Sequence, residues 1–290
     1  MTSVSSVRLI EEKDPSTADF GLKIIACETL RDELSHVAPD IETEFLKGRL
    51  HIYPDRMREE INAHIAATPG RRTILVGYGR CSNGTAGLKA GPHRLILPAV
   101  DDCIALLLGS RRRYLQEYAR VPGTYYYTRG WIEELGDPYQ EYEKMVPRFG
   151  EETARRLALT IMANYTRLAL VETGAYDVRK CEEYVAKVAE FYDLPVENVQ
   201  GHMRLFKKLV SGGWDGEFIV VEPGAVLDET VFWRIPNEID SLPEDPDAPG
   251  AWGPAIKVCD DCAASQADDH PSTSGASGGP GSSKRCPGRL

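Results

Sequence analysis

Short apolar runs alternate along this chain with segments of helical periodicity, and this alternation constrains the fold more than any other feature. The runs expected to form strands are 22–27, 50–53, 72–79, 93–100, 167–173 and 217–223. The segments expected to form helices are 28–37, 55–68, 101–120, 131–146, 150–165, 178–192 and 197–211. Strands that alternate with helices are typical of parallel sheets covered by helices. We therefore predict an α/β fold of layered βα units with mostly parallel sheets.

The two ends of the chain stand apart from this pattern. We expect an N-terminal extension at residues 1–18 and an α/β globular body, in one or two lobes, at residues 19–240. Residues 241–290 are rich in Gly, Ser, Pro and Asp, a composition that buries too little apolar surface to offset its ordering entropy. We expect this tail to be disordered. Its three cysteines (Cys259, Cys262 and Cys286) lack the paired spacing of a complete zinc site, so incidental thiols are the favoured interpretation.

Composition excludes several classes of protein. A net charge of −10 argues against general nucleic-acid affinity, because phosphate contacts need a basic face. No run of 18 uncharged apolar residues is long enough for a membrane span, and the N-terminus lacks the apolar core of a secretory signal. We therefore expect a cytoplasmic protein. In that reducing compartment its seven cysteines are expected to be thiols or metal ligands rather than disulfides.

Three of the predicted strands are followed by a cysteine within a few residues of their carboxyl ends. These cysteines are Cys27, Cys81 and Cys103, separated by 54 and 22 residues. Such spacing does not fit a zinc finger, in which the ligands come in close pairs. It does fit three βα units that each contribute one thiolate to a shared crevice, because ligands bind beyond the carboxyl ends of parallel strands.

Two interpretations of these three cysteines remain open. Three thiolates can hold a four-iron cluster (4Fe-4S) or a zinc ion and leave one coordination position free to act as a Lewis acid on a substrate. Alternatively, each cysteine is a small buried apolar residue near a strand end. A lone nucleophile at Cys81 would need a base, and the sequence offers His36, His51, His64 and His93 without placing one beside it.

The loop around Cys81, GYGRCSNG (77–84), is rich in glycine. Its glycines are spaced neither as a dinucleotide fingerprint nor as a phosphate-binding Walker A loop. We assign Gly79, Asn83 and Gly84 to cofactor binding, since glycine lets the backbone approach a bound group closely. Asn83-Gly84 is also an ordinary turn dipeptide, so a plain turn stays an alternative.

Two further residues are candidates for catalysis. Arg129 follows three adjacent tyrosines, in a segment (122–131) that either lines a pocket, with Arg129 binding a carboxylate, or packs its aromatic residues on the core as a β-like segment. Glu172 ends a predicted strand, where it either serves in acid–base chemistry or caps a helix. Asp101 or Asp102 is expected to supply the N-cap of the helix that follows.

Several separate blocks of sequence carry a family resemblance. They are ACETLRDEL (26–34), LHIYPD (50–55), GYGRCSNGTAGL (77–88), DDCIALLLGS (101–110), PGTYYYTRGWIE (122–133) and EPG (222–224). Through them, residues 20–226 resemble the uncharacterised family called domain of unknown function 1638. Members commonly carry HDC where this chain has Asp101-Asp102-Cys103, which puts in doubt any role for that histidine here.

The resemblance implies a setting but no established activity. Members of the family are often encoded near corrinoid-dependent methyltransferase systems, which suggests one-carbon or methylamine metabolism. The layout of lone cysteines is also similar to that of quinolinate synthase and 2-hydroxyacyl-CoA dehydratases, without a motif match. We therefore expect a metal or iron–sulfur protein that activates a small anionic, thiol or hydroxy substrate as a lyase, desulfidase or group transferase. The alternatives are an accessory protein that binds a corrinoid protein or methyltransferase, and a zinc-thiolate methyltransferase.

Overall fold

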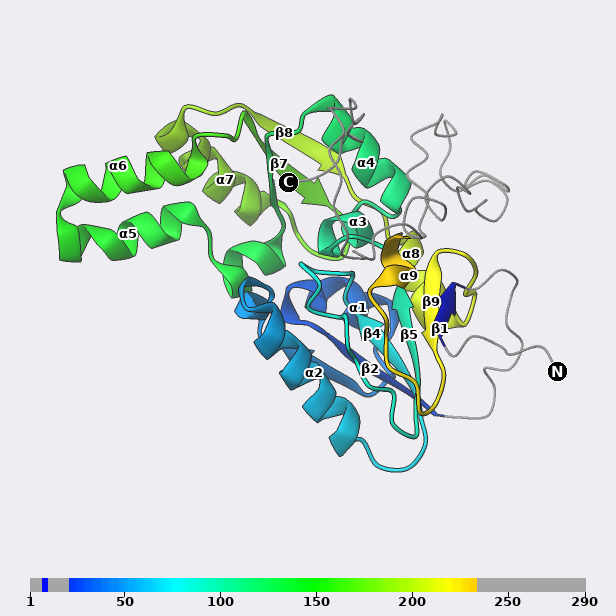
Figure 1. Ribbon diagram of the computed structural model, residues 1–290. Coiled ribbons are helices and arrows are strands. Elements are labelled where there is room, and N and C mark those ends of the chain that lie inside the picture. The colour runs from blue at the N-terminus through cyan, green and yellow to red at the C-terminus, as the bar shows by residue number, and fades with distance from the viewer. Residues whose placement is uncertain (1–6, 10–20, 234–290) are drawn as a thin grey trace, which may run out of the picture. The chain divides into compact units, whose positions relative to one another are not determined.

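The computed structural model describes residues 7–9 and 21–233. It is an α/β structure with two mostly parallel sheets, as predicted (Figure 1). Val7–Leu9, within the predicted N-terminal extension, forms strand β1. The predicted tail at 241–290 lies outside the described residues. No helix of the described part is both long enough and apolar enough to cross a membrane.

The larger sheet has six strands. In spatial order they are β1, β9 (Phe218–Val221), β5 (Arg94–Pro98), β4 (Thr73–Gly77), β2 (Leu22–Cys27) and β3 (Thr43–Leu46). The four strands from β5 to β3 run parallel, and β9 is antiparallel to both of its neighbours. The carboxyl ends of β2, β4 and β5 therefore lie next to one another at one edge of the sheet.

The smaller sheet has three parallel strands, β6 (Thr124–Tyr127), β7 (Arg167–Glu172) and β8 (Val196–Gln200). The α-helices are α1 (Arg31–Val37), α2 (Pro54–Ala67), α3 (Cys103–Leu107), α4 (Arg111–Arg120), α5 (Pro138–Phe149), α6 (Glu151–Met162), α7 (Arg179–Tyr192), α8 (Arg204–Ser211) and α9 (Thr230–Trp233). Short helices of other types are η2 (Glu28–Leu30), η3 (Gly48–Ile52) and the π-helix η4 (Trp131–Leu135).

Along each strand of the larger sheet, successive side chains point alternately into two separate hydrophobic cores. Ile25 and Ile74 point to the face covered by α2, whose Met57, Ile61 and Ile65 recur every four residues and are fully buried. Ile24 and Leu75 point to the opposite face, where the leucines of α3 and α8 pack. Because both faces are covered, the central residues of β2, β4, β5 and β9 are apolar on both faces rather than alternating.

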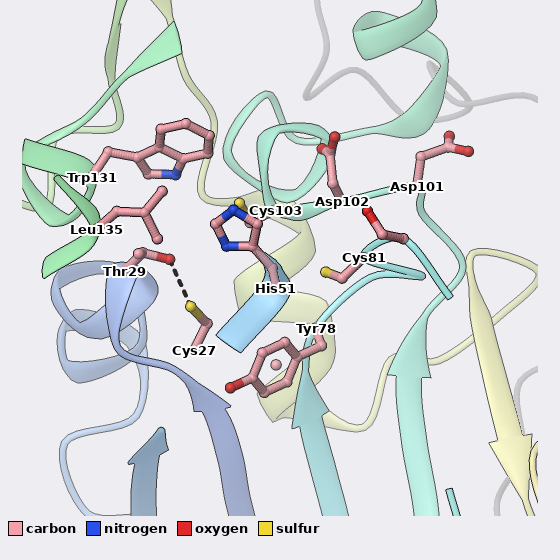
Figure 2. Close-up of a pocket in the computed structure, with 12 residues that line it drawn as sticks. Cys27, Thr29, His51, Tyr78, Cys81, Asp101, Asp102, Cys103, Trp131 and Leu135 are labelled. Carbon is pink, nitrogen blue, oxygen red and sulfur yellow. Dashed lines mark hydrogen bonds between the residues drawn. The ribbon is translucent and has the colours of Figure 1, made fainter. Parts of the chain in front are cut away.

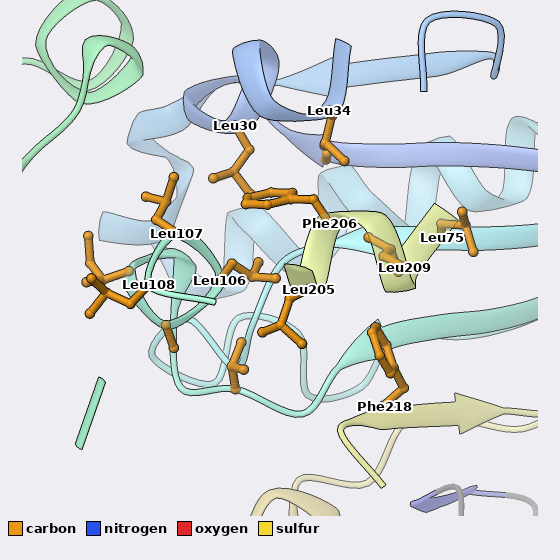
Figure 3. Packing of buried hydrophobic residues seen from close by; sticks show 14 of the residues in the cluster. Leu30, Leu34, Leu75, Leu106, Leu107, Leu108, Leu205, Phe206, Leu209 and Phe218 are labelled. Atoms are coloured by element: carbon orange, nitrogen blue, oxygen red, sulfur yellow. The ribbon is translucent and has the colours of Figure 1, made fainter. Parts of the chain in front are cut away.

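The second of these cores is shared by the two sheets. Figure 3 shows Phe206 and Leu209 of α8 packed among leucines from α1, α3 and the larger sheet. Ala169 and Val171 of β7 belong to the same cluster. A common apolar core of this kind holds the smaller sheet against the carboxyl edge of the larger one, which is the region where the candidate site is found.

Three predictions of secondary structure were wrong. Residues 50–53 are not a strand: they belong to η3 and its end, while the strand beside β2 is Thr43–Leu46. The predicted helix 101–120 is two helices, broken at Gly109, which has φ +86°. The predicted helix 197–211 begins as strand β8, which pairs with β7, and becomes helical only at Arg204. In each case a contact with another part of the chain overrides the local pattern.

Two predicted segments need smaller corrections. The helix expected at 131–146 is the π-helix η4 followed by α5, with Gly136 at φ +75° between them and Asp137 as the N-cap of α5. The segment 122–131 contains strand β6, so the β-like alternative is confirmed there. Tyr126 and Tyr127 are buried, and each contributes to a different core cluster.

Candidate functional site

The three cysteines predicted as metal ligands line one cavity. Cys27 is the last residue of β2, Cys81 follows β4 by four residues, and Cys103 opens α3 just after β5. Figure 2 shows their side chains around a common space at the carboxyl edge of the larger sheet. The expectation that three βα units deliver their thiols to a shared crevice is met by this arrangement.

The cavity has a volume of about 180 Å³. That is close to the size of an apolar cavity that holds one benzene molecule. Its walls come from the strand ends, from η3 and from η4. The lining residues are Cys27, Thr29, His51, Gly77, Tyr78, Cys81, Ser82, Asp101, Asp102, Cys103, Trp131 and Leu135.

The loop that carries Cys81 has an unusual backbone. Cys81, Ser82 and Asn83 have φ of +45°, +55° and +65°, so three consecutive non-glycine residues adopt the left-handed conformation. Each such residue costs roughly 1–2 kcal/mol relative to the right-handed form. The N–H of Gly84 donates to the carbonyl of Cys81 at 2.9 Å and closes this left-handed turn. Strain of this kind is concentrated at functional sites, where the surrounding structure enforces it.

Backbone hydrogen bonds fix the Cys81 loop against the segment that leads to Cys103. The N–H of Arg80 donates to the carbonyl of Val100 at 2.8 Å, and the N–H of Cys81 donates to the carbonyl of Asp101 at 2.9 Å. Gly79 makes this approach possible, since a Cβ there would lie 2.7 Å from the Val100 oxygen. The separation of Cys81 and Cys103 is therefore set by backbone contacts rather than by flexible side chains.

The predicted cofactor-binding residues of this loop have packing roles. A Cβ on Gly84 would lie 2.5 Å from the terminal methyl of Met57, so a side chain there would displace the end of Met57 of α2. The side-chain amide of Asn83 donates to Glu229 at 3.1 Å and ties the loop to the region before α9. Neither residue lines the cavity, and neither does Gly79. These three residues support the wall that presents Cys81.

The environment of the thiols favours their neutral form in the absence of a cation. Burial raises the pKa of Cys27, Cys81 and Cys103 above that of a free thiol, and the nearby charge of Asp102 raises it further at Cys81 and Cys103. The hydroxyl of Thr29 donates to Cys27 Sγ at 3.0 Å and partly opposes this rise at Cys27. A thiol with a raised pKa is a poor nucleophile at neutral pH. This disfavours the interpretation of Cys81 as a lone nucleophile.

The pair Asp101-Asp102 anchors the third cysteine. Asp102 is the N-cap of α3: one oxygen accepts hydrogen bonds from the N–H groups of Ile104 and Ala105, and the other accepts from the hydroxyl of Tyr114 at 3.3 Å. Burial raises the pKa of Asp102 to about 6. Asp101 forms an ion pair with Arg111 at 2.7 Å. The predicted N-cap is thus confirmed at Asp102, and Asp101 holds the start of α4.

His51 is the histidine that the structure places in the cavity. Its Nδ1 lies 2.8 Å from the carbonyl oxygen of Gly48, which can only accept, so Nδ1 is the donor in this contact and Nε2 takes no part in it. The N–H of Gly48 donates in turn to the buried carboxylate of Glu28 at 2.9 Å. The imidazole stacks on Trp131 with a centroid separation of 6.5 Å. The sequence offers His51 as one of four candidate bases and gives no reason to prefer it.

Two polar atoms in the cavity wall lack partners within the described residues. These atoms are the hydroxyl of Tyr78 and the indole Nε1 of Trp131, both buried. Figure 2 shows the hydroxyl of Tyr78 on the Cys27 side of the cavity. The indole N–H of Trp131 is close enough to Cys103 to oppose the rise in its pKa, but it does not reach hydrogen-bonding geometry. Buried donors without partners are rare in folded proteins and call for an explanation.

One protein family matches this chain. A family described as protein of unknown function, DUF1638, matches residues 45–210, more than half of the chain. The chain belongs to this family. The resemblance predicted from the sequence blocks is therefore confirmed. No curated protein and no solved structure matches the chain. The matched range of this DUF1638 protein includes His51, Cys81, Cys103 and Trp131, and Cys27 precedes it.

The two predicted catalytic residues of this DUF1638 protein do not line the cavity. Arg129 forms an ion pair with Asp32 and lines a different pocket, together with Cys181 and residues of η4 and α7. Glu172 is exposed at the end of β7, where its backbone carbonyl accepts from the N–H of Gly201. The cysteine site is instead completed by His51, Tyr78 and Trp131, which the sequence analysis did not assign to it.

A single metal ion is held by donor side chains that converge on one point. Among residues 7–9 and 21–233, no three His, Cys, Asp or Glu side chains are arranged to hold a single metal ion. A cubane cluster separates its thiolate ligands more widely than a single ion, because each thiolate binds a different iron.

Proposed function

We propose that this protein binds an iron–sulfur cluster through Cys27, Cys81 and Cys103 and leaves one iron open to a small substrate. The single observation that carries the proposal is that these three thiols, each from a different strand end, line one cavity. Thiols whose pKa is raised by burial give up their protons when a metal group binds, because its positive charge reverses the local preference. The raised thiol pKa values are therefore compatible with ligation.

A four-iron cluster fits this site better than zinc does. One zinc ion binds each thiolate at about 2.3 Å, which requires three sulfurs roughly 3.8 Å apart around a filled centre. Here the three thiols line a cavity of about 180 Å³, more space than one ion takes up. A cluster would occupy part of such a space and use one thiolate per iron.

The chain's own residues would control access to the cluster. An iron without a protein ligand supplies Lewis-acid activation of a substrate oxygen or sulfur. Ser82 is exposed and lines the cavity, so it marks a side from which a small molecule can enter. Trp131 and Leu135 of η4 cover the side that faces the smaller sheet. This arrangement suits a lyase, a desulfidase or a group transferase acting on a small molecule.

Metal analysis tests the proposal directly. Full-length protein purified without oxygen and reconstituted with iron and sulfide is expected to hold about four iron and four sulfide per chain, with the visible absorption of a cubane cluster. Cys27→Ala, Cys81→Ala and Cys103→Ala should each lose most of the iron. Cys181→Ala is the matched control, because Cys181 is buried as Cys27 and Cys81 are but lies outside the cavity.

Other outcomes would redirect the assignment. One zinc per chain and no sulfide would favour a zinc-thiolate methyltransferase. No metal, together with co-purification of a corrinoid protein, would favour the accessory role. Iron that persists in the Cys27→Ala, Cys81→Ala and Cys103→Ala variants but is lost in a Cys259→Ser/Cys262→Ser variant would place the cluster in the tail and overturn the ligand assignment.

A further inference from the structure

The charges around the cavity restrict what can enter it. None of the described residues that line it is a lysine or an arginine. Its wall carries two aspartates instead, and Arg111, which pairs with Asp101, is not among the lining residues. Three thiolates on a cluster would add further negative charge. An anionic substrate would therefore enter against repulsion, with no lysine or arginine in the described wall to bind it. The sequence-based expectation of an anionic substrate relied on Arg129, which lies elsewhere.

The unpartnered polar atoms indicate what a ligand must offer. Tyr78 is 3% exposed, and its hydroxyl has no partner among the described residues; the same holds for the indole nitrogen of Trp131. A buried donor left without an acceptor costs about 1–3 kcal/mol. Two such donors in the wall of one cavity are accounted for if a bound molecule presents acceptor atoms to them.

His51 adds the complementary requirement. Its Nδ1 is held by the carbonyl of Gly48, so Nε2 is the ring nitrogen that accepts a hydrogen bond when the imidazole is neutral. The contact between Glu28 and the N–H of Gly48 holds that segment in place. A ligand that suits the whole wall therefore has an acceptor for Tyr78 and Trp131 and a donor for His51. A hydroxyl beside a carbonyl supplies both.

We infer that the cavity binds a small uncharged molecule with a hydroxyl or carbonyl oxygen, to which Tyr78 and Trp131 donate hydrogen bonds and from which His51 accepts one. The inference rests on the proposed function only in that a cluster shares the cavity. The polar side chains belong to the wall with or without metal. A cavity of about 180 Å³ that also holds a cluster leaves room for only a few non-hydrogen atoms.

Three small probes test the inference. Hydroxyacetone carries a ketone and a hydroxyl, pyruvate replaces the hydroxymethyl group by a carboxylate, and butan-2-one replaces the hydroxyl by a methyl group. Saturation-transfer NMR titrations would measure their dissociation constants on the full-length protein, both reconstituted and metal-free, with iron and sulfide measured on the same samples. Hydroxyacetone is expected to bind at least about tenfold more tightly than pyruvate, and more tightly than butan-2-one.

Conservative variants assign the contacts. Tyr78→Phe and Trp131→Phe should each weaken hydroxyacetone binding by about five- to tenfold, the effect of losing one neutral hydrogen bond. Tyr118→Phe and Trp233→Phe are the matched controls, because both side chains are about half exposed and lie outside the cavity. Tyr78→Phe removes only an unpartnered hydroxyl, so its melting temperature should equal or exceed that of the wild type, which separates lost binding from lost folding.

The possible results divide clearly. Pyruvate binding as tightly as hydroxyacetone, absence of hydroxyacetone binding to both forms of the wild-type protein, or unchanged affinity in both cavity variants would each overturn the inference. Hydroxyacetone binding to metal-free protein that never takes up iron would support the inference while the proposed cluster fails. Iron uptake without any hydroxyacetone binding would support the cluster and overturn the inference, so the two failures are distinguishable.

Discussion

The buried carboxylate of Glu33 accepts a hydrogen bond of 2.8 Å from the hydroxyl of Thr173. Glu33 belongs to α1, beside the larger sheet, and Thr173 follows β7 of the smaller one. Glu33 is 1% exposed, and burial raises its pKa to about 7. One hydrogen bond thus links the two sheets through a group that titrates near neutral pH.

This link predicts a pH dependence of stability. The pKa of Glu33 is higher in the folded chain than its ordinary value of 4.5, so the folded state holds this proton more tightly than the unfolded state does. The contribution of Glu33 is therefore most favourable below pH 4.5 and declines as the pH rises through about 7. The decline is on the order of 1–3 kcal/mol in the free energy of unfolding.

Glu33→Gln is the variant that isolates this effect. Its amide oxygen can still accept from Thr173 but does not titrate. Urea unfolding at pH 5 and pH 8 should show a smaller loss of stability between these values in Glu33→Gln than in the wild type. Glu152→Gln, an exposed change on α6, is the control. Equal pH dependence in wild type and Glu33→Gln would contradict the assignment.

The three-cysteine site was predictable because its logic is local to each strand. Apolar runs indicate strands, parallel strands place their carboxyl ends at one edge, and Cys27, Cys81 and Cys103 follow three such ends. The N-cap at Asp102 was predictable for the same reason, since it depends on residues only two and three positions further along. No contact across the chain is needed for either inference.

The rest of the site depends on contacts between distant segments. His51 enters the cavity because η3 forms where a strand was predicted, and η3 is held by Glu28, twenty residues earlier in the chain. Trp131 reaches the cavity because the backbone at Gly130 packs directly on Thr29. Arg129 was predicted to bind substrate, but Asp32, ninety-seven positions away, pairs with it instead. Local patterns carry no information about such pairings.

The contact between Gly130 and Thr29 leads to a second prediction. A Cβ at Gly130 would overlap the carbonyl oxygen of Thr29, which is backbone and cannot move aside as a side chain does. Gly130→Ala should therefore lower the free energy of unfolding by about 3 kcal/mol or more, at the upper end for overpacking. Gly213→Ala is the control. A Cβ at Gly213 would lie 3.4 Å from its nearest neighbour, the hydroxyl oxygen of Ser211, so the free energy of unfolding should stay within about 1 kcal/mol of that of the wild type.

The effect of Gly130→Ala on the cavity distinguishes this packing role from a general loss of folding. Because Gly130 precedes Trp131, a displaced backbone should move the indole away from Cys103 and His51. Gly130→Ser is expected to be at least as damaging, since it adds the same Cβ and one more atom. A Gly130→Ala protein with wild-type stability in urea titrations would show that the segment shifts without cost, contrary to the prediction.

The left-handed turn at Cys81–Asn83 gives the third prediction, because Ser82 is exposed and its side chain can be changed without disturbing the core. Ser82 has φ +55°, where a β-branched residue is strained and glycine is not. Ser82→Val should destabilise the protein by roughly 1–2 kcal/mol, while Ser82→Gly should be neutral or stabilise it by up to about 1 kcal/mol. Thermal unfolding of both variants measures the difference. Two variants with the same melting temperature would mean that the turn does not hold Ser82 in the left-handed region. The claim that Cys81 is held in a strained backbone conformation would then also be wrong.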